Sequence, residues 1–325
     1  MARRRRRATP GPPLPPRDGL GPARVRLPLD GTWPTVVAFL AERTGDPDGI
    51  ARRVRAGEVF LADGTPVVAD TAYRPGSSAY LYRDLPEEAD VPGELTVLLH
   101  DEESGLLAVD KPPFLATMPR GSHVAQTAVV RLRRELGLPD IAPVHRLDRL
   151  TSGVLLLTTR REARGAYQQM VQAGGLAKTY LALAPLRADL DLPLTVANRL
   201  VKRRGSLQAV VEDGPVNAVT RIELSDTVEH EGLLVGSYRL TPTTGQTHQL
   251  RVHLAGLGIP ILGDPLYPQV RDVSPGDFGT PLQLLAHAVR FTDPVSGEAR
   301  VIVSRRELPI AGANDGAVSV ADGGL

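Results

Sequence analysis

The 325-residue chain contains no cysteine, which excludes disulfide bonds, thiolate nucleophiles and cysteine-ligated zinc sites. It also lacks an apolar run of the roughly 18 residues that a membrane-spanning helix requires. Its first residues pass from an arginine run into Pro and Gly rather than into an apolar segment, which argues against a secretory signal. We therefore expect a cytoplasmic protein without membrane partners, and we expect it to act as a monomer.

Lysine is scarce, because only three of the 38 basic residues are lysine. Such a bias can reflect genome composition, so the abundance of arginine alone is poor evidence for nucleic-acid binding. The placement of the charges is more informative. Residues 1–26 hold eight arginines and one aspartate, whereas the rest of the chain holds 30 basic and 36 acidic residues. The basic charge is therefore concentrated in an N-terminal arm, and the folded body is mildly acidic.

The composition, with 42% hydrophobic and 23% charged residues, is that of a globular protein, and the length favours two domains. Residues 1–24 are predicted to form a flexible arm rich in Pro and Arg, which either binds phosphates or remains a solvated tail. Residues 25–84 are typical of two short helices followed by strands, two of which flank a turn at Asp63-Gly64. With three arginines at 52–55, this unit resembles the small RNA-binding module of ribosomal protein S four, although a structural appendage explains the pattern equally well.

Residues 85–94, rich in Pro and Glu, are predicted to be a linker, residues 95–308 the main domain and residues 309–325 a flexible tail. The continuous apolar run at 154–157 suits a strand that is buried on both faces. The other expected helices and strands of the main domain lie at 95–99, 106–109, 125–136, 163–171, 179–183, 216–224, 233–240, 282–291 and 300–303. This mixture, without regular alternation of strand and helix, predicts an α+β fold with a largely antiparallel sheet and flanking helices.

The densest group of chemically active side chains is the segment His145-Arg146-Leu147-Asp148-Arg149-Leu150-Thr151-Ser152-Gly153. Asp148 stands between two guanidinium groups in a loop restricted by Pro143 and Gly153, so we expect its carboxylate to stay ionised. An ionised, partly desolvated carboxylate can act as a nucleophile or a general base. A structural aspartate that pairs with its arginine neighbours is the alternative that composition alone favours.

A second segment, Lys178-Thr179-Tyr180-Leu181-Ala182, is typical of a strand. Alternate residues of a strand share a face, so Lys178, Tyr180 and Ala182 point the same way, together with Ala184. Small alanines beside the tyrosine ring would leave an open shelf, which suits the stacking of a planar ligand such as a nucleic-acid base. Ordinary core packing is the competing interpretation of such a tyrosine.

A third segment, residues 244–254, has the sequence Thr-Gly-Gln-Thr-His-Gln-Leu-Arg-Val-His-Leu. Thr247 is a plausible N-cap for a helix, and Leu250 then begins an apolar stripe along that helix. Arg251 would lie at the edge of the stripe. From there it could pair with a buried carboxylate, unless it is an ordinary surface arginine.

The histidines of the chain suggest two further possibilities, and both have weak support. His248 and His253 lack the i, i+4 spacing of helical zinc ligands, so the sequence predicts no metal site here. A hydrolase could use Ser152 with His145 or His248. However, the chain has no Gly-x-Ser-x-Gly elbow at this serine, which precedes a buried strand rather than a helix.

Together the three segments resemble the RluA-type pseudouridine synthases, over most of residues 95–308. The runs that carry the resemblance are His-Arg-Leu-Asp-x-x-Thr-Ser-Gly, Lys-x-Tyr, Thr-Gly-x-Thr-His-Gln-Leu-Arg-Val-His-Leu and Gly-x-Pro-Ile-Leu-Gly-Asp. A leading S-four-like RNA-binding module is common in that family. Three positions depart from its pattern: Gln246 stands where Arg or Lys is usual, Phe114 stands where a glycine is common, and residues 213–217 lack a lysine often seen there.

The resemblance implies that Asp148 is the catalytic aspartate, that Tyr180 stacks on a flipped uracil, and that Arg251 holds Asp148 by a salt bridge. The implied reaction detaches uracil from its sugar, rotates it and rejoins it through carbon five. Because atoms and charge balance, no cofactor is expected. The enzyme must supply a flipped base, an ionised carboxylate and a dry pocket that retains the detached uracil. Tyr180 is also a candidate for moving the proton of carbon five.

The expected partner is RNA, ribosomal RNA in the first place and transfer RNA as the alternative. By resemblance, Arg146 occupies the space of the extruded uridine and Leu250 lines the base pocket. Arg149 and Lys178 add positive charge beside the expected path of the RNA. A non-catalytic RNA-binding or ribosome-assembly factor on the same fold is the competing hypothesis, and loss of the aspartate would be its mark. Asp148 is present.

Overall fold

The structure is a computed structural model that describes residues 12–308 apart from 83, 86, 231–232 and 275. The arginine run and the predicted C-terminal tail at 309–325 therefore lie outside the described residues. The chain divides into two compact units, Met1–Glu87 and Glu88–Leu325. No helix among the described residues is long and apolar enough to cross a membrane.

The smaller unit contains two helices and a three-stranded sheet with the strand order β1-β3-β2. Its elements are β1 (Ala23–Arg26), α1 (Val36–Thr44), α2 (Pro47–Arg55), β2 (Val59–Leu61) and β3 (Ser78–Leu81). The side chain of Thr35 caps α1, and Gly45 ends it in the left-handed conformation. The expected second strand of the hairpin at Asp63-Gly64, residues 66–68, is not a regular strand: residue 66 forms an isolated bridge to Phe60, and the N–H of Val67 donates to the carbonyl of Val59 at 2.8 Å.

The predicted arm is too long at its C-terminal end. Leu14 is buried, and the hydroxyl of Tyr82 donates a hydrogen bond to the carbonyl of Pro15 at 2.7 Å. The guanidinium of Arg17 pairs with Glu58 at 2.8 Å and lies 4.0 Å from the centre of the Tyr82 ring. Residues 12–24 therefore pack on the smaller unit, because they carry apolar and stacking groups among their prolines.

The predicted linker at 85–94 is also partly wrong. The carboxylate of Glu88 accepts hydrogen bonds from the backbone N–H groups of Val124, Ala125 and Gln126 at 2.7–3.1 Å. Val91 is buried in the main core of the larger unit. A charged acceptor and an apolar anchor thus fix this segment, which belongs to the larger unit from Glu88 onward.

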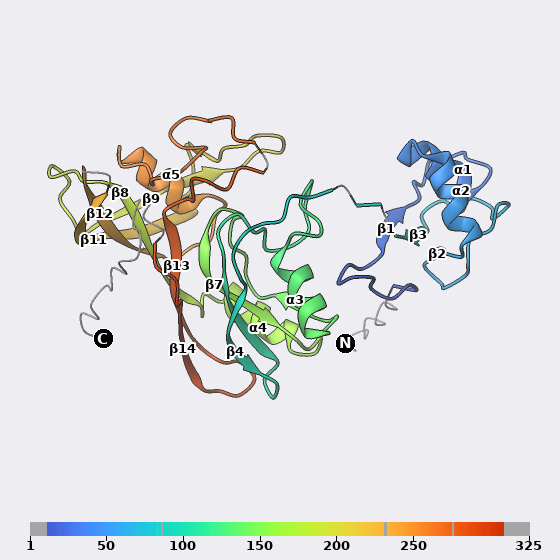
Figure 1. The fold of residues 1–325 in the computed structure, drawn as a ribbon, viewed down its shortest axis with the longest axis horizontal. Coiled ribbons are helices and arrows are strands. Elements are labelled where there is room, and N and C mark those ends of the chain that lie inside the picture. Colours follow the sequence, from blue (N-terminus) through green and yellow to red (C-terminus); the bar gives the residue numbers. More distant parts are fainter. Residues whose placement is uncertain (1–11, 83, 86, 231–232, 275, 309–325) are drawn as a thin grey trace. The chain divides into compact units, whose positions relative to one another are not determined.

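The larger unit is built on one 11-stranded sheet (Figure 1). Nine of its strands follow the order β10-β9-β11-β12-β8-β13-β7-β5-β4, and the other two, β14 and β6, pair with β13 and β7. All the pairings are antiparallel except that of β13 with β7, so the predicted α+β fold with a largely antiparallel sheet is confirmed. The strands are β4 (Thr96–Asp101), β5 (Leu106–Lys111), β6 (Ala142–Pro143), β7 (Ser152–Thr158), β8 (Ala177–Pro185), β9 (Leu194–Val201), β10 (Val210–Glu212), β11 (Ala218–His230), β12 (Leu233–Pro242), β13 (Leu284–Thr292) and β14 (Ala299–Val303). The helices are α3 (Ala128–Leu136), α4 (Arg164–Gln172) and α5 (Gln249–Gly256).

Strand β7 is buried on both faces, as its apolar run predicts. Leu155 and Leu157 belong to the core cluster that includes residues of α3 and α5. Val154 and Leu156 belong to a second cluster, which includes Tyr167 of α4. Because alternate side chains of a strand point to opposite faces, this run packs into both clusters.

The start of β7 meets β13 at an unusually close approach. Ser152 pairs with Leu285 and Gly153 with Ala286, in the one parallel contact of the sheet. Gly153 has φ +105°, and a Cβ atom there would lie 2.3 Å from the carbonyl oxygen of Ala286. Only glycine fits this position. The contact fixes the loop that carries Asp148, which ends immediately before β7.

Candidate active site

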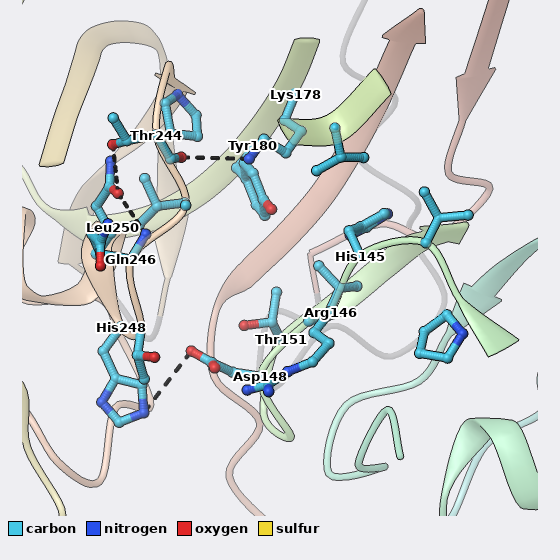
Figure 2. A pocket seen from close by; sticks show the side chains of 18 of the residues that line it. His145, Arg146, Asp148, Thr151, Lys178, Tyr180, Thr244, Gln246, His248 and Leu250 are labelled. Atoms are coloured by element: carbon cyan, nitrogen blue, oxygen red, sulfur yellow. Dashed lines mark hydrogen bonds and ion pairs between the residues drawn. The ribbon is translucent and has the colours of Figure 1, made fainter. Parts of the chain in front are cut away.

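Three segments that are distant in the sequence line one cavity of about 770 Å³ (Figure 2). They are the loop before β7, the beginning of β8 and the segment that leads into α5. The cavity brings together most of the residues singled out from the sequence, namely Arg146, Asp148, Lys178, Tyr180, Leu250 and Arg251. Arg149 does not line it, although Arg149 is adjacent to Asp148 in the chain. A cavity of this size can hold a nucleoside.

The backbone on both sides of Asp148 is held firmly. The hydroxyl of Thr117 donates to the carbonyl of Leu147 at 2.7 Å and accepts from its N–H at 3.2 Å. The fully buried ammonium of Lys111 donates to the carbonyl of Arg149 at 3.3 Å and to that of Leu115 at 2.8 Å. The carboxylate of Asp148 itself keeps 30% of its surface exposed toward the cavity. It is thus a rigidly placed and accessible anion.

Burial lowers the pKa of Lys111 to about 7, although the negative charge of Asp148 opposes this shift. The positive charges of Arg306 and Arg149 lower it further. The sequence gives no sign of this lysine's structural role, because a Lys-Pro pair alone does not reveal that the side chain turns inward.

His145 anchors the beginning of the same loop. Its Nε2 accepts the N–H of Leu156 at 3.2 Å, so the ring is bound to β7. Burial, with a contribution from the charge of Lys178, lowers the pKa of His145 to about 4, and the ring is neutral at pH 7. Ser152 is buried and its hydroxyl donates to the carbonyl of Leu284 at 3.4 Å. The hydrolase hypothesis therefore lacks both an accessible nucleophile and a free base at this position.

Tyr180 and Lys178 enter the cavity from β8, as the strand pattern predicts (Figure 2). Burial and the charge of Asp148 both raise the pKa of the Tyr180 phenol, so it is protonated at neutral pH. The ammonium of Lys178 donates to the carbonyl of Thr244 at 3.4 Å. The expected open shelf is wrong, because Ala182 and Ala184 are fully buried in the core instead of bordering a free surface.

The predicted salt bridge between Arg251 and Asp148 is also wrong. Arg251 is 2% exposed, and its Nε and Nη2 donate to the two carboxylate oxygens of Asp264 at 2.7 and 2.6 Å. Oδ1 of Asp264 also accepts the N–H groups of Leu266 and Tyr267. A carboxylate buried this deeply needs a partner of opposite charge, and Arg251 supplies it.

The helix that carries Arg251 begins one residue later than predicted. Its N-cap is His248 rather than Thr247, and His248 has the left-handed φ of +60° without a capping hydrogen bond from its side chain. The side chain of Gln249, the first residue of α5, instead ties the helix to the loop before it. Its side-chain oxygen accepts from the N–H of Gln246 at 3.0 Å and from the hydroxyl of Thr244 at 2.8 Å.

His248 is the residue of the site that sequence reasoning missed. Its Nε2 lies 4.0 Å from Oδ2 of Asp148, across the cavity from the aspartate loop (Figure 2). Its Nδ1 lies 2.9 Å from the hydroxyl of Tyr267. The available signal is its place three residues before Arg251 in the Thr-His-Gln-Leu-Arg run, which puts it at the start of the same helix. Among the residues described, no group of three or more His, Asp or Glu could hold a metal ion.

Comparison with known proteins identifies the family of this fold and cavity. Residues 105–256 match the family model described as RNA pseudouridylate synthase. The dual-specificity RNA pseudouridine synthase RluA of Vibrio parahaemolyticus is 33% identical over 210 residues, which are 62% of this chain and 80% of that protein. The ribosomal large subunit pseudouridine synthase D of Xanthomonas campestris is 33% identical over 224 residues, 64% of each chain.

Two further comparisons define the extent of the likeness. The chain spans about half the length of the rice RNA pseudouridine synthase 7, with 32% identity over 197 residues that cover 58% of this chain and 48% of that protein. The solved human RNA pseudouridylate synthase domain containing 1 has the same fold, with a TM-score of 0.54, 24% identity and coverage of 66% of this chain and 86% of that one. The chain therefore belongs to the RluA-type RNA pseudouridine synthases, a family of isomerases.

Proposed function

We propose that this protein isomerises uridine to pseudouridine in structured RNA, with ribosomal RNA as its substrate and Asp148 as its catalytic aspartate. The observation that carries the proposal is the cavity. An accessible carboxylate, a tyrosine ring and an apolar leucine from three separate segments face one space large enough for a nucleoside.

The reaction needs only groups that the cavity contains. The bond from C1′ of the ribose to N1 of uracil breaks, the ring rotates, and a bond from C1′ to C5 replaces it. C5 loses a proton and N1 gains one, so the change is an isomerisation without oxidant or reductant. Asp148 assists cleavage of the glycosidic bond, while Tyr180 stacks on the base and Leu250 confines it.

The entrance to the cavity suits an RNA backbone. Arg146 is exposed on the aspartate loop, where it can fill the space that a flipped uridine leaves in the RNA. Arg149, next to Asp148 in the chain, and Lys178, in the cavity wall formed by β8, supply further positive charge. Burial, with the nearby charge of Arg251, lowers the pKa of the Arg149 guanidinium, which remains a cation at neutral pH. In the smaller unit, Arg52 and Arg55 are exposed on α2.

Tritium release tests the reaction and the role of Asp148. The probe is RNA from cells that lack the gene, labelled at carbon five of uridine, and the variants are Asp148→Asn and Asp191→Asn. Asp191 is an exposed carboxylate outside the cavity, so its variant is the matched control. We expect release by the wild type and the control, and none by Asp148→Asn. Equal release by all three proteins would exclude a catalytic role for Asp148, and absence of release by the wild type would favour a non-catalytic RNA-binding factor.

The choice of RNA needs a separate experiment. Ribosomal RNA is proposed because the Xanthomonas relative is named for the large ribosomal subunit. Pseudouridines should be mapped in ribosomal and transfer RNA from cells with and without the gene. We expect a site in ribosomal RNA to disappear with the gene. Loss confined to transfer RNA would assign the enzyme to that substrate instead.

A further inference from the structure

We propose that His248 is a positioning residue for Asp148: a neutral imidazole whose Nε2–H points at the carboxylate and whose tautomer is fixed by Tyr267. The inference rests on the proposed catalytic role of Asp148. His248 thereby has a role other than the zinc ligand or hydrolase base that its sequence position suggests.

The first observation is the position of the ring. Nε2 of His248 lies 4.0 Å from Oδ2 of Asp148, and both side chains line the cavity. The histidine side chain is 12% exposed and the aspartate 30%, so water has limited access to the gap between them. Hydrogen bonds of catalytic groups are often long without substrate and shorten when it binds. A small movement of the aspartate would bring it into hydrogen-bonding distance.

The second observation concerns the tautomer of the ring. The hydroxyl of Tyr267 accepts the N–H of Ala209 at 2.6 Å, so its own proton must go elsewhere. Two acceptors are near it: Nδ1 of His248 at 2.9 Å and the carbonyl of Ala209 at 3.3 Å. The shorter contact is the better hydrogen bond. On this ground we assign the phenol proton of Tyr267 to Nδ1, which places the imidazole proton on Nε2, facing Asp148.

Tyr267 is itself held in place by the buried ion pair. Oδ1 of Asp264 accepts the N–H of Tyr267 at 3.2 Å, and the guanidinium of Arg251 lies 5.2 Å from the centre of the Tyr267 ring. A continuous set of contacts thus runs from Arg251 through Asp264, Tyr267 and His248 to Asp148. Arg251 acts on the aspartate through these neighbours instead of through a direct salt bridge.

The third observation is the backbone of His248. Its φ of +60° lies in the left-handed region, which residues other than glycine seldom adopt and which asparagine tolerates better. Such strained positions occur at functional sites because the surrounding structure holds them there. A glycine would satisfy the turn at lower cost, so the turn itself does not require an imidazole.

The charges around the ring keep it neutral. Burial lowers the pKa of His248 to about 4, while the carboxylate of Asp148 raises it and the cations Arg251 and Lys202 lower it. Asp264, the partner of Arg251 in the buried ion pair, also raises this pKa. At pH 7 the ring can therefore donate a hydrogen bond, once the two groups approach, without adding a positive charge. It can orient the carboxylate and leave its negative charge available for the reaction.

The test compares two amides at position 248. His248→Gln keeps an N–H donor at about the reach of Nε2, whereas His248→Asn suits the left-handed backbone but is too short to reach Asp148. Single-turnover rates are measured with prebound RNA, alongside RNA affinity. We expect His248→Asn to lower the rate by about 10- to 100-fold with unchanged affinity, and His248→Gln to restore most of the rate. Wild-type rates in both variants would overturn the proposal. It would also be overturned if both variants lost rate equally and in proportion to their loss of thermal stability.

A pH profile separates positioning from a structural role. Removal of a hydrogen bond to the ionised carboxylate makes its protonated form more favourable. The acid side of the rate profile should therefore move to higher pH in His248→Asn and return in His248→Gln. An unmoved profile in His248→Asn would contradict the inference.

If Asp148→Asn remains active, the proposed function fails. If Asp148→Asn is inactive while His248→Asn behaves as wild type, only the inference fails.

Discussion

The guanidinium of Arg251 and the carboxylate of Asp264 form a bidentate ion pair at 2.6 and 2.7 Å in which both side chains are almost completely buried. Arg251 lines the cavity, and Asp264 also accepts two backbone N–H groups, including that of Tyr267. The internal salt bridge therefore organises the wall of the site without touching Asp148.

Removal of one member of this pair should be strongly destabilising. Asp264→Asn leaves a buried guanidinium without its counter-charge, for which we expect a loss of about 3–5 kcal/mol in the free energy of unfolding. Urea unfolding of the full chain measures it. Arg251→Met with Asp264→Leu removes both charges and should recover part of the stability but not the activity, because the N–H of Tyr267 loses its acceptor. A loss below about 1 kcal/mol in Asp264→Asn would show that the pair is only marginally stabilising.

Tyr180 should reveal separate roles for its ring and its hydroxyl. Tyr180→Phe keeps the stacking surface, so RNA affinity should be unchanged, while loss of the group that can pass the proton of carbon five should lower the single-turnover rate by about 100-fold or more. Tyr180→Ala should in addition lose about 1–3 kcal/mol of binding free energy from stacking. Filter binding and tritium release measure the two effects. A wild-type rate in Tyr180→Phe would restrict Tyr180 to stacking.

Acid should destabilise the protein before its carboxylates titrate. Burial lowers the pKa of His145, His248 and His253 to about 4 each, whereas an unfolded histidine titrates near 6.5. Between these values the unfolded chain binds more protons than the folded one, so stability falls as pH falls. The slope is at most about 1.4 kcal/mol per pH unit for each histidine. Urea unfolding between pH 7 and 5 measures this slope.

His253 provides the control for that experiment. Its ring is 1% exposed and contacts the hydroxyl of Thr220 at 2.9 Å and the side-chain oxygen of Asn198 at 3.0 Å. His253→Gln removes one titrating group and should make the dependence on pH shallower, even if it lowers stability at every pH. The same slope in both proteins would show that His253 does not contribute.

The sequence was sufficient for elements whose signals are local. The apolar run at 154–157 revealed a doubly buried strand, and the helix expected at 125–136 ends at Leu136, where Gly137 takes the left-handed conformation. It failed for β9, whose alternation of apolar and polar residues is weak, and for the segment after Glu88. In both cases the stabilising partners lie far away in the chain, at β11 and at residues 124–126.

By itself the sequence determined the fold class and, through its motifs, which aspartate, tyrosine and arginine belong to one site. A chain fixes the order of its residues and the face on which each one lies. The tertiary structure decided which groups pair. Arg251 bonds Asp264 rather than Asp148, and His248 faces the aspartate from the opposite wall. The physical reason is that a buried charge takes the partner that compensates its desolvation most completely, and only the packed fold determines which groups are near enough to compete.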